Sequence, residues 1–363
     1  MSLLTGQAQI GGSPPPSPIW GGRFITQVVT VMIEWDDFVE ETIKQDMSTV
    51  GTTKKRSIIG YIGGKFYQAP AIISLFPPHD IYVEPFFGAG HVFFQKSPVP
   101  LEIINDLYRI LFCFYKVLQE PNLFNRFVKR VWMSTSHEWL FLELVEKMDV
   151  YIEQCNSFSS PEEMMANLTD GDLVDIAVTF FLWNSMTPDG GTYPQSRVFP
   201  IQRSTRPTKF TDHRLSILYY MHKRLKNARI YCRDYKDIIL EYNFPEALIY
   251  LDPPYVHETR ENTRYYIKEF SNKEHEEMVD IIKDMRAKIA LSGYDNEIYR
   301  RLEEHGWKKV SIGTYSKRQR KKEMGEKSFQ AEEFVWINYP LSLLRQSHGV
   351  VDKTGLFASE DGD

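Results

Sequence analysis

The chain has 363 residues and is mildly acidic, with 43 Lys and Arg side chains against 48 Asp and Glu and a formal net charge of -5. This balance excludes a uniformly basic coat for nucleic acid, although it allows a local basic face. Cys113, Cys155 and Cys232 are too few and too scattered for a disulfide scaffold or a zinc ribbon, and no metal site is predicted. No apolar run reaches the roughly 18 residues of a membrane span. We therefore predict a cytoplasmic protein that acts without a membrane.

The two ends of the chain are predicted to lie outside the folded part. Residues 1–22 are rich in Gly and Pro, a composition that buries too little apolar surface to fold, and they predict a flexible tail. Residues 23–57 form an N-terminal extension to which the sequence assigns no role. Residues 346–363 are predicted to form a C-terminal tail.

From residue 58 onward, short β-rich runs alternate with helical patterns. The predicted strands are Ile81–Pro85, Leu101–Asn105, Arg229–Arg233, Ala247–Leu251, Lys288–Ser292, Lys308–Ile312 and Glu333–Tyr339. The predicted helices between them are Leu107–Gln119, Tyr235–Tyr242, Lys273–Arg286 and Asp295–Glu304. Strands that alternate with amphipathic helices predict a doubly wound α/β sheet. Only a basic loop separates the last two strands, which predicts an antiparallel hairpin at one edge.

Residues 120–227 interrupt this alternation after the second strand. Their helical patterns are Glu138–Met148, Pro161–Leu168, Asp172–Trp183 and Thr211–Asn227. A segment of this length is too large for a loop in a βαβ unit. We predict that it is a smaller, mainly helical domain inserted into a domain made of residues 58–119 and 228–345.

A glycine motif, Tyr82–Gly90, overlaps the first predicted strand and continues beyond its end. A turn containing Gly88 and Gly90 allows the backbone to approach a ligand closely, because glycine has no Cβ. Asp106 ends the next strand, where a carboxylate in dinucleotide-binding folds accepts hydrogen bonds from ribose hydroxyls. An ordinary strand–turn–helix connection with an acidic helix cap fits the same residues.

A second motif, Asp252-Pro253-Pro254-Tyr255, follows the apolar run Leu248–Leu251. Open α/β sheets bind ligands at this end of their strands. The prolines donate no N–H, so the carbonyls beside them stay free as acceptors. Together with the Asp252 carboxylate they suit an exocyclic amino group, which has two donor hydrogens, while Tyr255 suits stacking against a base. The structural alternative is a proline turn that ends a strand, with an incidental tyrosine.

Two shorter signals are weaker. Gly63-Gly64-Lys65 allows a close backbone approach, and Lys65 could neutralise a carboxylate, although a solvated turn explains the motif better. Asp234 ends the third strand at the same sheet edge as Asp106 and Asp252, so it is a candidate to hydrogen-bond a purine. An N-cap of the helix that follows is an equally good interpretation of Asp234.

Basic side chains gather in two parts of the chain, in the 197–233 segment and in the loop between the last two predicted strands. Contact with phosphates needs such patches. A solvated helix face explains the residues from Lys223 to Arg229 well, but the 317–322 loop less well. The candidate DNA contacts are Arg197, Arg203, Arg206, Lys317, Arg318, Arg320 and Lys321.

In their order along the chain, these motifs resemble the Dam-like, or D12, class of DNA adenine-N6 methyltransferases. The resemblance covers about residues 58 to 340. It rests on Gly63-Gly64-Lys65, Glu84–Gly90, Asn105-Asp106, Asp252–Tyr255 and Glu333–Asn338. It implies a Rossmann-like, seven-stranded methyltransferase sheet, with residues 120–227 as the target-recognition domain. It also implies site-specific DNA modification, as in restriction–modification systems.

The resemblance implies S-adenosylmethionine as the methyl donor. In that family the donor lies along the glycine turn, which here is Phe87, Gly88 and Gly90. Lys65 and Glu84 would then lie near its amino-acid end. Asp106 would bind its ribose and Asp234 its adenine.

The resemblance also implies a target adenine flipped out of double-stranded DNA, since its N6 cannot be reached inside the stack. Asp252 and the carbonyl of Pro253 would accept the two N6 hydrogens, with Pro254 restricting the turn. Tyr255 would stack on the flipped base, and Phe270 would wall the pocket. Positioning and electrostatics would supply the catalysis, without a metal or a covalent intermediate.

The chain also departs from that family. Phe180–Asn184 stands where the family more often has an Asn-Arg pair, so no base-reading residue is transferred, and Pro188–Gly191 is predicted to form the hairpin turn there. His91 is larger than the small residue expected after the glycine turn. We expect a monomer or weak dimer from a bacterium, archaeon or phage, with a cognate restriction endonuclease as a further candidate partner.

Two other functions remain open from the sequence. One is an S-adenosylmethionine-dependent N-methyltransferase that acts on RNA or a protein glutamine; the basic insertion favours duplex DNA instead. The other is a catalytically silent DNA-binding relative; the intact Asp252, Gly88 and Gly90 argue against it. A cytosine-C5 methyltransferase would need a nucleophilic cysteine after a proline, and none of the three cysteines has one.

Overall fold

The structure, a computed structural model, describes residues 57–61, 63–134, 138–187, 212–255, 270–316 and 330–344. All of them belong to one compact unit of the chain, Thr52–Asp363. The predicted tails and the Pro188–Gly191 turn lie outside the described residues. So do all seven candidate DNA contacts: Arg197, Arg203, Arg206, Lys317, Arg318, Arg320 and Lys321.

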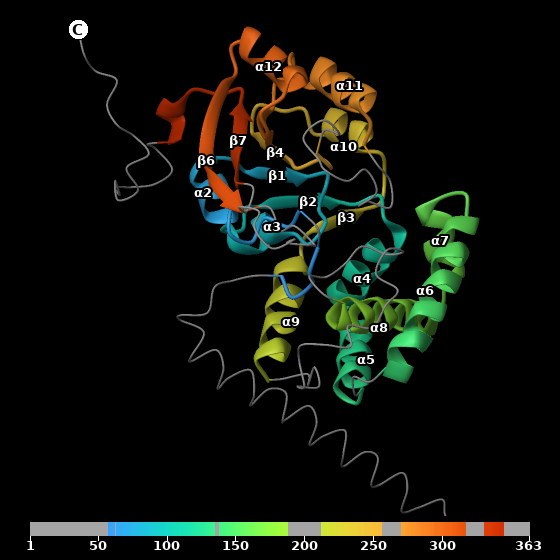
Figure 1. Cartoon of the computed structure of the whole chain (residues 1–363). Coiled ribbons are helices and arrows are strands. Elements are labelled where there is room, and N and C mark those ends of the chain that lie inside the picture. The colour runs from blue at the N-terminus through green and yellow to red at the C-terminus, as the bar shows by residue number, and fades with distance from the viewer. Residues whose placement is uncertain are drawn as a thin grey trace, which may run out of the picture. The chain divides into compact units, whose positions relative to one another are not determined.

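The described residues form a seven-stranded sheet in the order β3-β2-β1-β4-β5-β7-β6 (Figure 1). The strands are β1 (Ile81–Glu84), β2 (Leu101–Asn105), β3 (Arg229–Tyr231), β4 (Ala247–Leu251), β5 (Lys288–Tyr294), β6 (Lys308–Ser316) and β7 (Gln330–Ile337). The first five run parallel, and β7 lies antiparallel between β5 and β6. The predicted α/β sheet and its antiparallel hairpin are therefore confirmed. All of β4 is buried, which explains its continuous apolar sequence.

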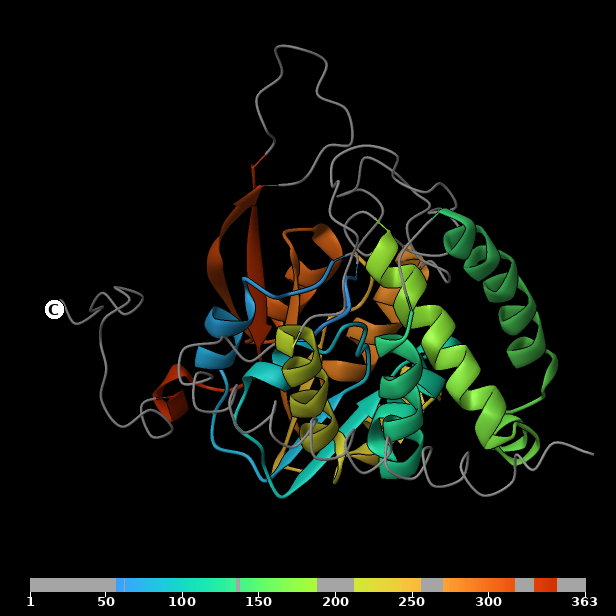
Figure 2. The ribbon, with the colours of Figure 1, turned by 90° about the horizontal axis from the view of Figure 1, so that it is seen from below.

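Helices cover both faces of this sheet. One face carries α10 (Tyr235–Glu241), α11 (Asn272–Ile282) and α12 (Glu297–Glu304), as Figure 1 shows. The other face carries α2 (Ala69–Ser74), α3 (His91–Gln95), α4 (Arg109–Gln119) and α9 (Asp212–Leu225), and Figure 2 shows α4 and α9 in front of the sheet. The sequence explains where α11 begins, because Ser271 and Glu274 form a capping box there. A single 3-10 turn, Leu341–Leu343, follows β7.

Four helices lie between α4 and α9 in the described part of the chain. They are α5 (Pro121–Trp132), α6 (Glu138–Ser157), α7 (Pro161–Asn167) and α8 (Asp170–Met186). Helix α8 is almost entirely buried and packs against α4, α5 and α6. The sequence pattern did not predict α5, although Pro121 at its first position is a common helix start.

Arg224 of α9 is largely buried, although its basic neighbours suggest a solvated helix face. Its guanidinium pairs with Glu102 of β2 and donates to the carbonyl of Phe93, so it ties α9 to the sheet. The three cysteines are buried and free. Within the described ranges, every helix is too short or too polar to cross a membrane.

Candidate active site

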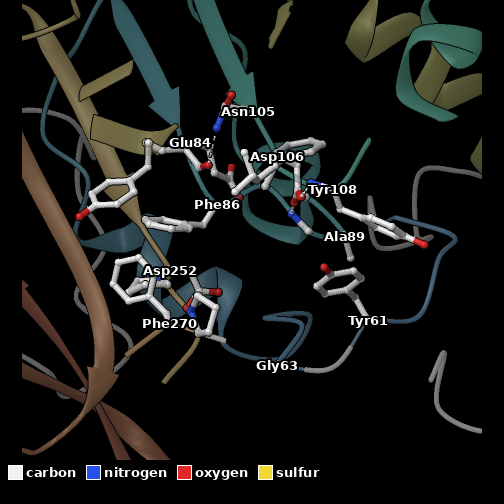
Figure 3. A pocket seen from close by; sticks show the side chains of 18 of the residues that line it. Tyr61, Gly63, Glu84, Phe86, Ala89, Asn105, Asp106, Tyr108, Asp252 and Phe270 are labelled. Atoms are coloured by element: carbon white, nitrogen blue, oxygen red, sulfur yellow. Dashed lines mark hydrogen bonds between the residues drawn. The ribbon is translucent and has the colours of Figure 1, made fainter. Parts of the chain in front are cut away.

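The parallel strands β3, β2, β1 and β4 end at one edge of the sheet, and the loops that follow them line a pocket of about 240 Å³ (Figure 3). Arg109 and Asn156 line it too, so the α4–α6 region also borders the pocket. Every predicted catalytic and donor-binding residue lies in its lining: Lys65, Glu84, Phe87, Gly88, Gly90, Asp106, Asp234, Asp252, Pro253, Pro254 and Tyr255. The structure thus brings together motifs that are far apart in the sequence.

The glycine turn after β1 needs its two glycines. Gly88 and Gly90 have φ angles of 48° and 66°, in the left-handed region that favours glycine. A Cβ at Gly90 would lie 2.4 Å from the ring of Phe87. The amide of Gly90 also donates to the carbonyl of Phe87 at 2.7 Å, which closes the turn. The turn therefore presents backbone, without side chains at the two glycines, to the pocket.

Asp106 locks this turn to the end of β2. Its Oδ2 accepts from the amide of Gly88 at 2.8 Å, and its Oδ1 accepts from the amide of Tyr108 at 2.9 Å. Burial raises the pKa of Asp106 to about 6, although both amides favour the ionised form. Asp106 is therefore a half-buried side chain that is mostly ionised at neutral pH, and Figure 3 shows it beside the glycine turn.

Asn105 is a site residue whose part in the pocket the sequence did not reveal. Its amide nitrogen donates to the carbonyls of Pro85 and Arg233, both at 3.0 Å. Its Oδ1 accepts from the amide of Arg233 at 2.8 Å. One buried side chain thus fastens together the ends of β1, β2 and β3. The available signal was a polar residue that ends the strand directly after the apolar pair Ile103 and Ile104.

Asp234 and an aromatic cluster form another part of the lining. Asp234 accepts from the amide of Lys236 and caps α10, as its local interpretation predicted, and it also lines the pocket. The rings of Phe86, Tyr235 and Phe270 lie 5.1 to 5.6 Å apart. The hydroxyl of Tyr235 is buried and has no hydrogen-bond partner among the described residues. This wall therefore combines flat apolar faces with an unused polar atom.

Lys65 lies at the centre of a buried polar cluster. Its Nζ is 2.7 Å from Oδ1 of Asp252 and 3.3 Å from Oε1 of Glu333. It also donates to the hydroxyl of Tyr255 at 2.5 Å, and that hydroxyl donates to Glu333. Burial disfavours the charged lysine, but the two carboxylates outweigh it and raise its pKa well above the usual value. Lys65 is therefore an ammonium ion that forms an ion pair with Asp252.

Asp252 keeps one carboxylate oxygen available. Lys65 and the hydroxyl of Ser292 both contact its Oδ1, at 2.7 and 2.8 Å, whereas no described residue hydrogen-bonds its Oδ2. Burial raises the pKa of Asp252, and Lys65 opposes that rise. Oδ2 is thus an acceptor held at the carboxyl end of β4. Ser292 of β5 was not predicted, because nothing in its local sequence points to β4.

Glu84 is buried beside this cluster and holds a proton near neutral pH. The hydroxyl of Tyr82 donates to its Oε2 at 2.7 Å. Burial, and to a lesser extent the charge of Asp252, raise the pKa of Glu84 to about 8, although the hydrogen bond from Tyr82 lowers it. Glu84 therefore lines the pocket mainly as a neutral carboxylic acid.

Comparison with known proteins finds one matching family and several curated relatives. The model of the family "D12 class N6 adenine-specific DNA methyltransferase" matches residues 61–316. A type II methyltransferase, M.MjaIII, from Methanocaldococcus jannaschii is 29% identical over 244 residues, which is 65% of this chain and 74% of the relative. A DNA adenine methylase of Salmonella typhi is 24% identical over 255 residues, 68% of this chain and 84% of the relative. The corresponding protein of Escherichia coli K12 is 23% identical over the same length.

Proposed function

The chain belongs to the D12 class N6 adenine-specific DNA methyltransferase family, and we propose that it moves the methyl group of S-adenosylmethionine to an adenine flipped out of double-stranded DNA. Family membership confirms the predicted resemblance and the enzyme class, a DNA adenine methyltransferase. The comparisons give no support to an RNA, protein-glutamine or catalytically silent alternative. The observation that carries the proposal is Oδ2 of Asp252, which no described residue hydrogen-bonds and which lies in one pocket with the glycine turn.

The residues of the pocket fit S-adenosylmethionine, which when bound supplies a methyl group on a positively charged sulfur. The bare turn at Gly88 and Gly90 lets backbone approach the donor closely. Asp106 is ionised near neutral pH and can accept from ribose hydroxyls. The flat aromatic wall and the hydroxyl of Tyr235, which has no hydrogen-bond partner among the described residues, suit a purine, with Asp234 beside them as an acceptor for its amino group. Lys65 and Glu84 would lie toward the amino-acid end.

The other half of the pocket suits the target base. Asp252 Oδ2 and the carbonyl of Pro253 would accept the two N6 hydrogens, which directs the nitrogen lone pair toward the methyl group. Tyr255 would stack on the flipped base, in a position set by its hydroxyl contacts with Lys65 and Glu333. Because burial raises the pKa of Asp252, this carboxylate is also suited to take the proton that N6 loses.

DNA binding is proposed to fall to the insertion and to the loop between β6 and β7. Support comes from the basic sequence clusters, which contain the candidate contacts from Arg197 to Arg206 and from Lys317 to Lys321. We further propose that the enzyme is cytoplasmic, since its substrate is cellular DNA. We also propose that it is a monomer or weak dimer. A cognate restriction endonuclease is a candidate partner, because such a nuclease is paired with a methyltransferase of the same site.

The proposal is tested by incubating the protein with radiolabelled S-adenosylmethionine and unmethylated DNA, then identifying the labelled nucleoside. We expect N6-methyladenine, and a loss of at least about 100-fold in rate for Asp252→Ala, the scale of a lost electrostatic contact at a reacting atom. Asp284→Ala, at an exposed position outside the pocket, is the control and should keep full activity. Label in RNA or protein instead of DNA, or equal rates for Asp252→Ala and wild type, would refute the proposal.

A further inference from the structure

Glu333 lies in the active-site cluster although it comes from the antiparallel strand β7, on the far side of β5 from the strand that carries Asp252. Its side chain is only 1% exposed. Its hydrogen-bond and ion-pair contacts in the described chain are all with donors: the ammonium of Lys65, the hydroxyl of Tyr255 and the amide of Gln68 at 3.2 Å. Three donors around two oxygens are the surroundings of an ionised carboxylate.

The charge of the cluster depends on this residue. Lys65 contributes one positive charge, and Asp252 and Glu333 contribute two negative charges, so the buried cluster carries a net charge of about −1. Without Glu333, Lys65 would pair with Asp252 alone, and the pair would be neutral. Burial makes this difference matter, because charges interact far more strongly in the protein interior than in water. Glu84 does not change the balance near pH 7, because it holds its proton there.

We propose that Glu333 is a positioning residue that offsets Lys65, so that Asp252 keeps its negative charge toward the cationic methyl donor and the amino group that is methylated. This role rests on the proposed function. Lys65 and Glu333 together hold the hydroxyl of Tyr255, which fixes its ring beside the base site. The excess negative charge favours a positively charged donor over its neutral, demethylated product and stabilises positive charge that develops on N6.

The isosteric variant Glu333→Gln separates charge from shape. Its amide oxygen can still accept from Tyr255, but the cluster loses one negative charge. We expect the variant to weaken binding of S-adenosylmethionine about tenfold more than binding of S-adenosylhomocysteine, a preference worth about 1.4 kcal/mol. The second ligand lacks the methyl group and the positive charge, so it reports the shape of the site. Titration calorimetry without DNA measures both dissociation constants.

Glu332→Gln is the matched control. It removes the same charge from the neighbouring residue of β7, whose exposed carboxylate accepts from Ser311. It should leave the ratio of the two dissociation constants unchanged. If Glu333→Gln weakens both ligands equally, or changes the ratio no more than Glu332→Gln, the charge role is refuted.

Glu333→Asp keeps the test decisive if the glutamine variant does not fold. It retains the charge on a shorter side chain, so the preference for the cationic ligand should stay close to that of the wild type. Loss of the preference in Glu333→Asp would overturn the proposal. A wild-type protein that binds neither ligand would instead refute the proposed function, whereas an active wild type with an unaffected Glu333→Gln would refute only this inference.

Discussion

Two buried lysines lie in clusters with opposite charge balance. Lys65 stands between two carboxylates, Asp252 and Glu333, which raise its pKa even though burial opposes the charged form. Lys96 shares one carboxylate, Glu102, with a second cation. Its Nζ lies 2.6 Å from Glu102, but burial outweighs that attraction and lowers its pKa. The first cluster has an excess of negative charge and the second an excess of positive charge.

The surroundings of the two clusters explain what each can do. The Lys96 ammonium lies 4.3 Å from the centre of the Tyr82 ring, and Cζ of Arg224 lies 4.2 Å from that of Phe93. These cation–π contacts stabilise the excess positive charge. Arg224 completes the cluster through a bidentate ion pair with Glu102. Those contacts join α9 to the sheet. The Lys65 cluster instead lines the pocket, and no described residue hydrogen-bonds Oδ2 of Asp252. We therefore assign a structural role to the Lys96 cluster and a chemical role to the Lys65 cluster.

The largest expected effect is that of removing the cation from the pocket. Lys65→Met leaves Asp252 and Glu333 facing each other in a buried site, so the pKa of one of them must rise and it takes up a proton. We expect methylation at pH 7 to fall at least about 100-fold, as for a lost electrostatic contact at the reacting atoms. The rate should recover partly as the pH rises and Asp252 loses its proton. Initial rates between pH 6 and pH 9 measure this.

Lys96→Met is the partner variant for this comparison. It keeps the Glu102–Arg224 pair, and Met preserves most of the buried volume. Its methylation rate should stay within about threefold of the wild type. No hydrogen bond or ion pair in the described part of the chain joins Lys96 to Asp252, and substitutions at sites without shared partners usually act independently. A pH-independent loss for Lys65→Met, or an equal loss for Lys96→Met, would contradict the division into a chemical and a structural cluster.

Much of this comparison was predictable from local sequence. Asp252 and the glycine turn follow apolar strand patterns, and the rule that parallel strands end at one edge of a sheet places them together. The periodicity of apolar residues and the Gly and Pro turn residues thus predicted the sheet, its hairpin and the residues that line the pocket from β1 to β4. Asp234 shows the limit of such arguments, because its helix cap and its place in the pocket are both real.

The partners of both lysines were not predictable in the same way. The sequence indicates Glu333 only as part of a strand motif, since a single glutamate on β7 gives no sign that β7 inserts beside β5. Arg224 belongs to a run of basic residues that reads as a solvated face, and its burial follows from where α9 docks. Side-chain partners across distant strands depend on packing order, which local periodicity does not encode.

The next effect in size concerns the shared carboxylate of the structural cluster. Glu102→Gln leaves Lys96 and Arg224 buried without a negative partner, and breaking a buried pair in this way costs about 3–5 kcal/mol. We expect the free energy of unfolding in urea to fall by that amount. The rate per folded molecule should change little at a temperature where the variant is folded. Unchanged stability would show that the cluster does not hold α9 to the sheet.

The last effect appears only as a dependence of stability on pH, and it concerns Glu84, whose carboxyl is influenced by charges of both clusters. Burial raises its pKa from 4.5 to about 8, Asp252 adds to the rise and Lys96 opposes it. Between pH 4.5 and 8 the folded protein therefore holds a proton that the unfolded chain has released, and this contribution lowers stability as the pH rises. The slope is at most about 1.4 kcal/mol per pH unit. Glu84→Gln should remove it from the urea unfolding free energies measured without ligand.

The two clusters should shift the upper end of that pH window in opposite directions. Asp252→Asn removes a negative charge near Glu84, so its pKa should fall and the loss of stability should end at a lower pH. Lys96→Met removes a positive charge, so the loss should extend to a higher pH. Each curve is compared with that of the same variant carrying Glu84→Gln, which isolates the Glu84 proton from all other titrating groups. Shifts of the same sign would mean that Glu84 responds to repacking rather than to the charges of Asp252 and Lys96.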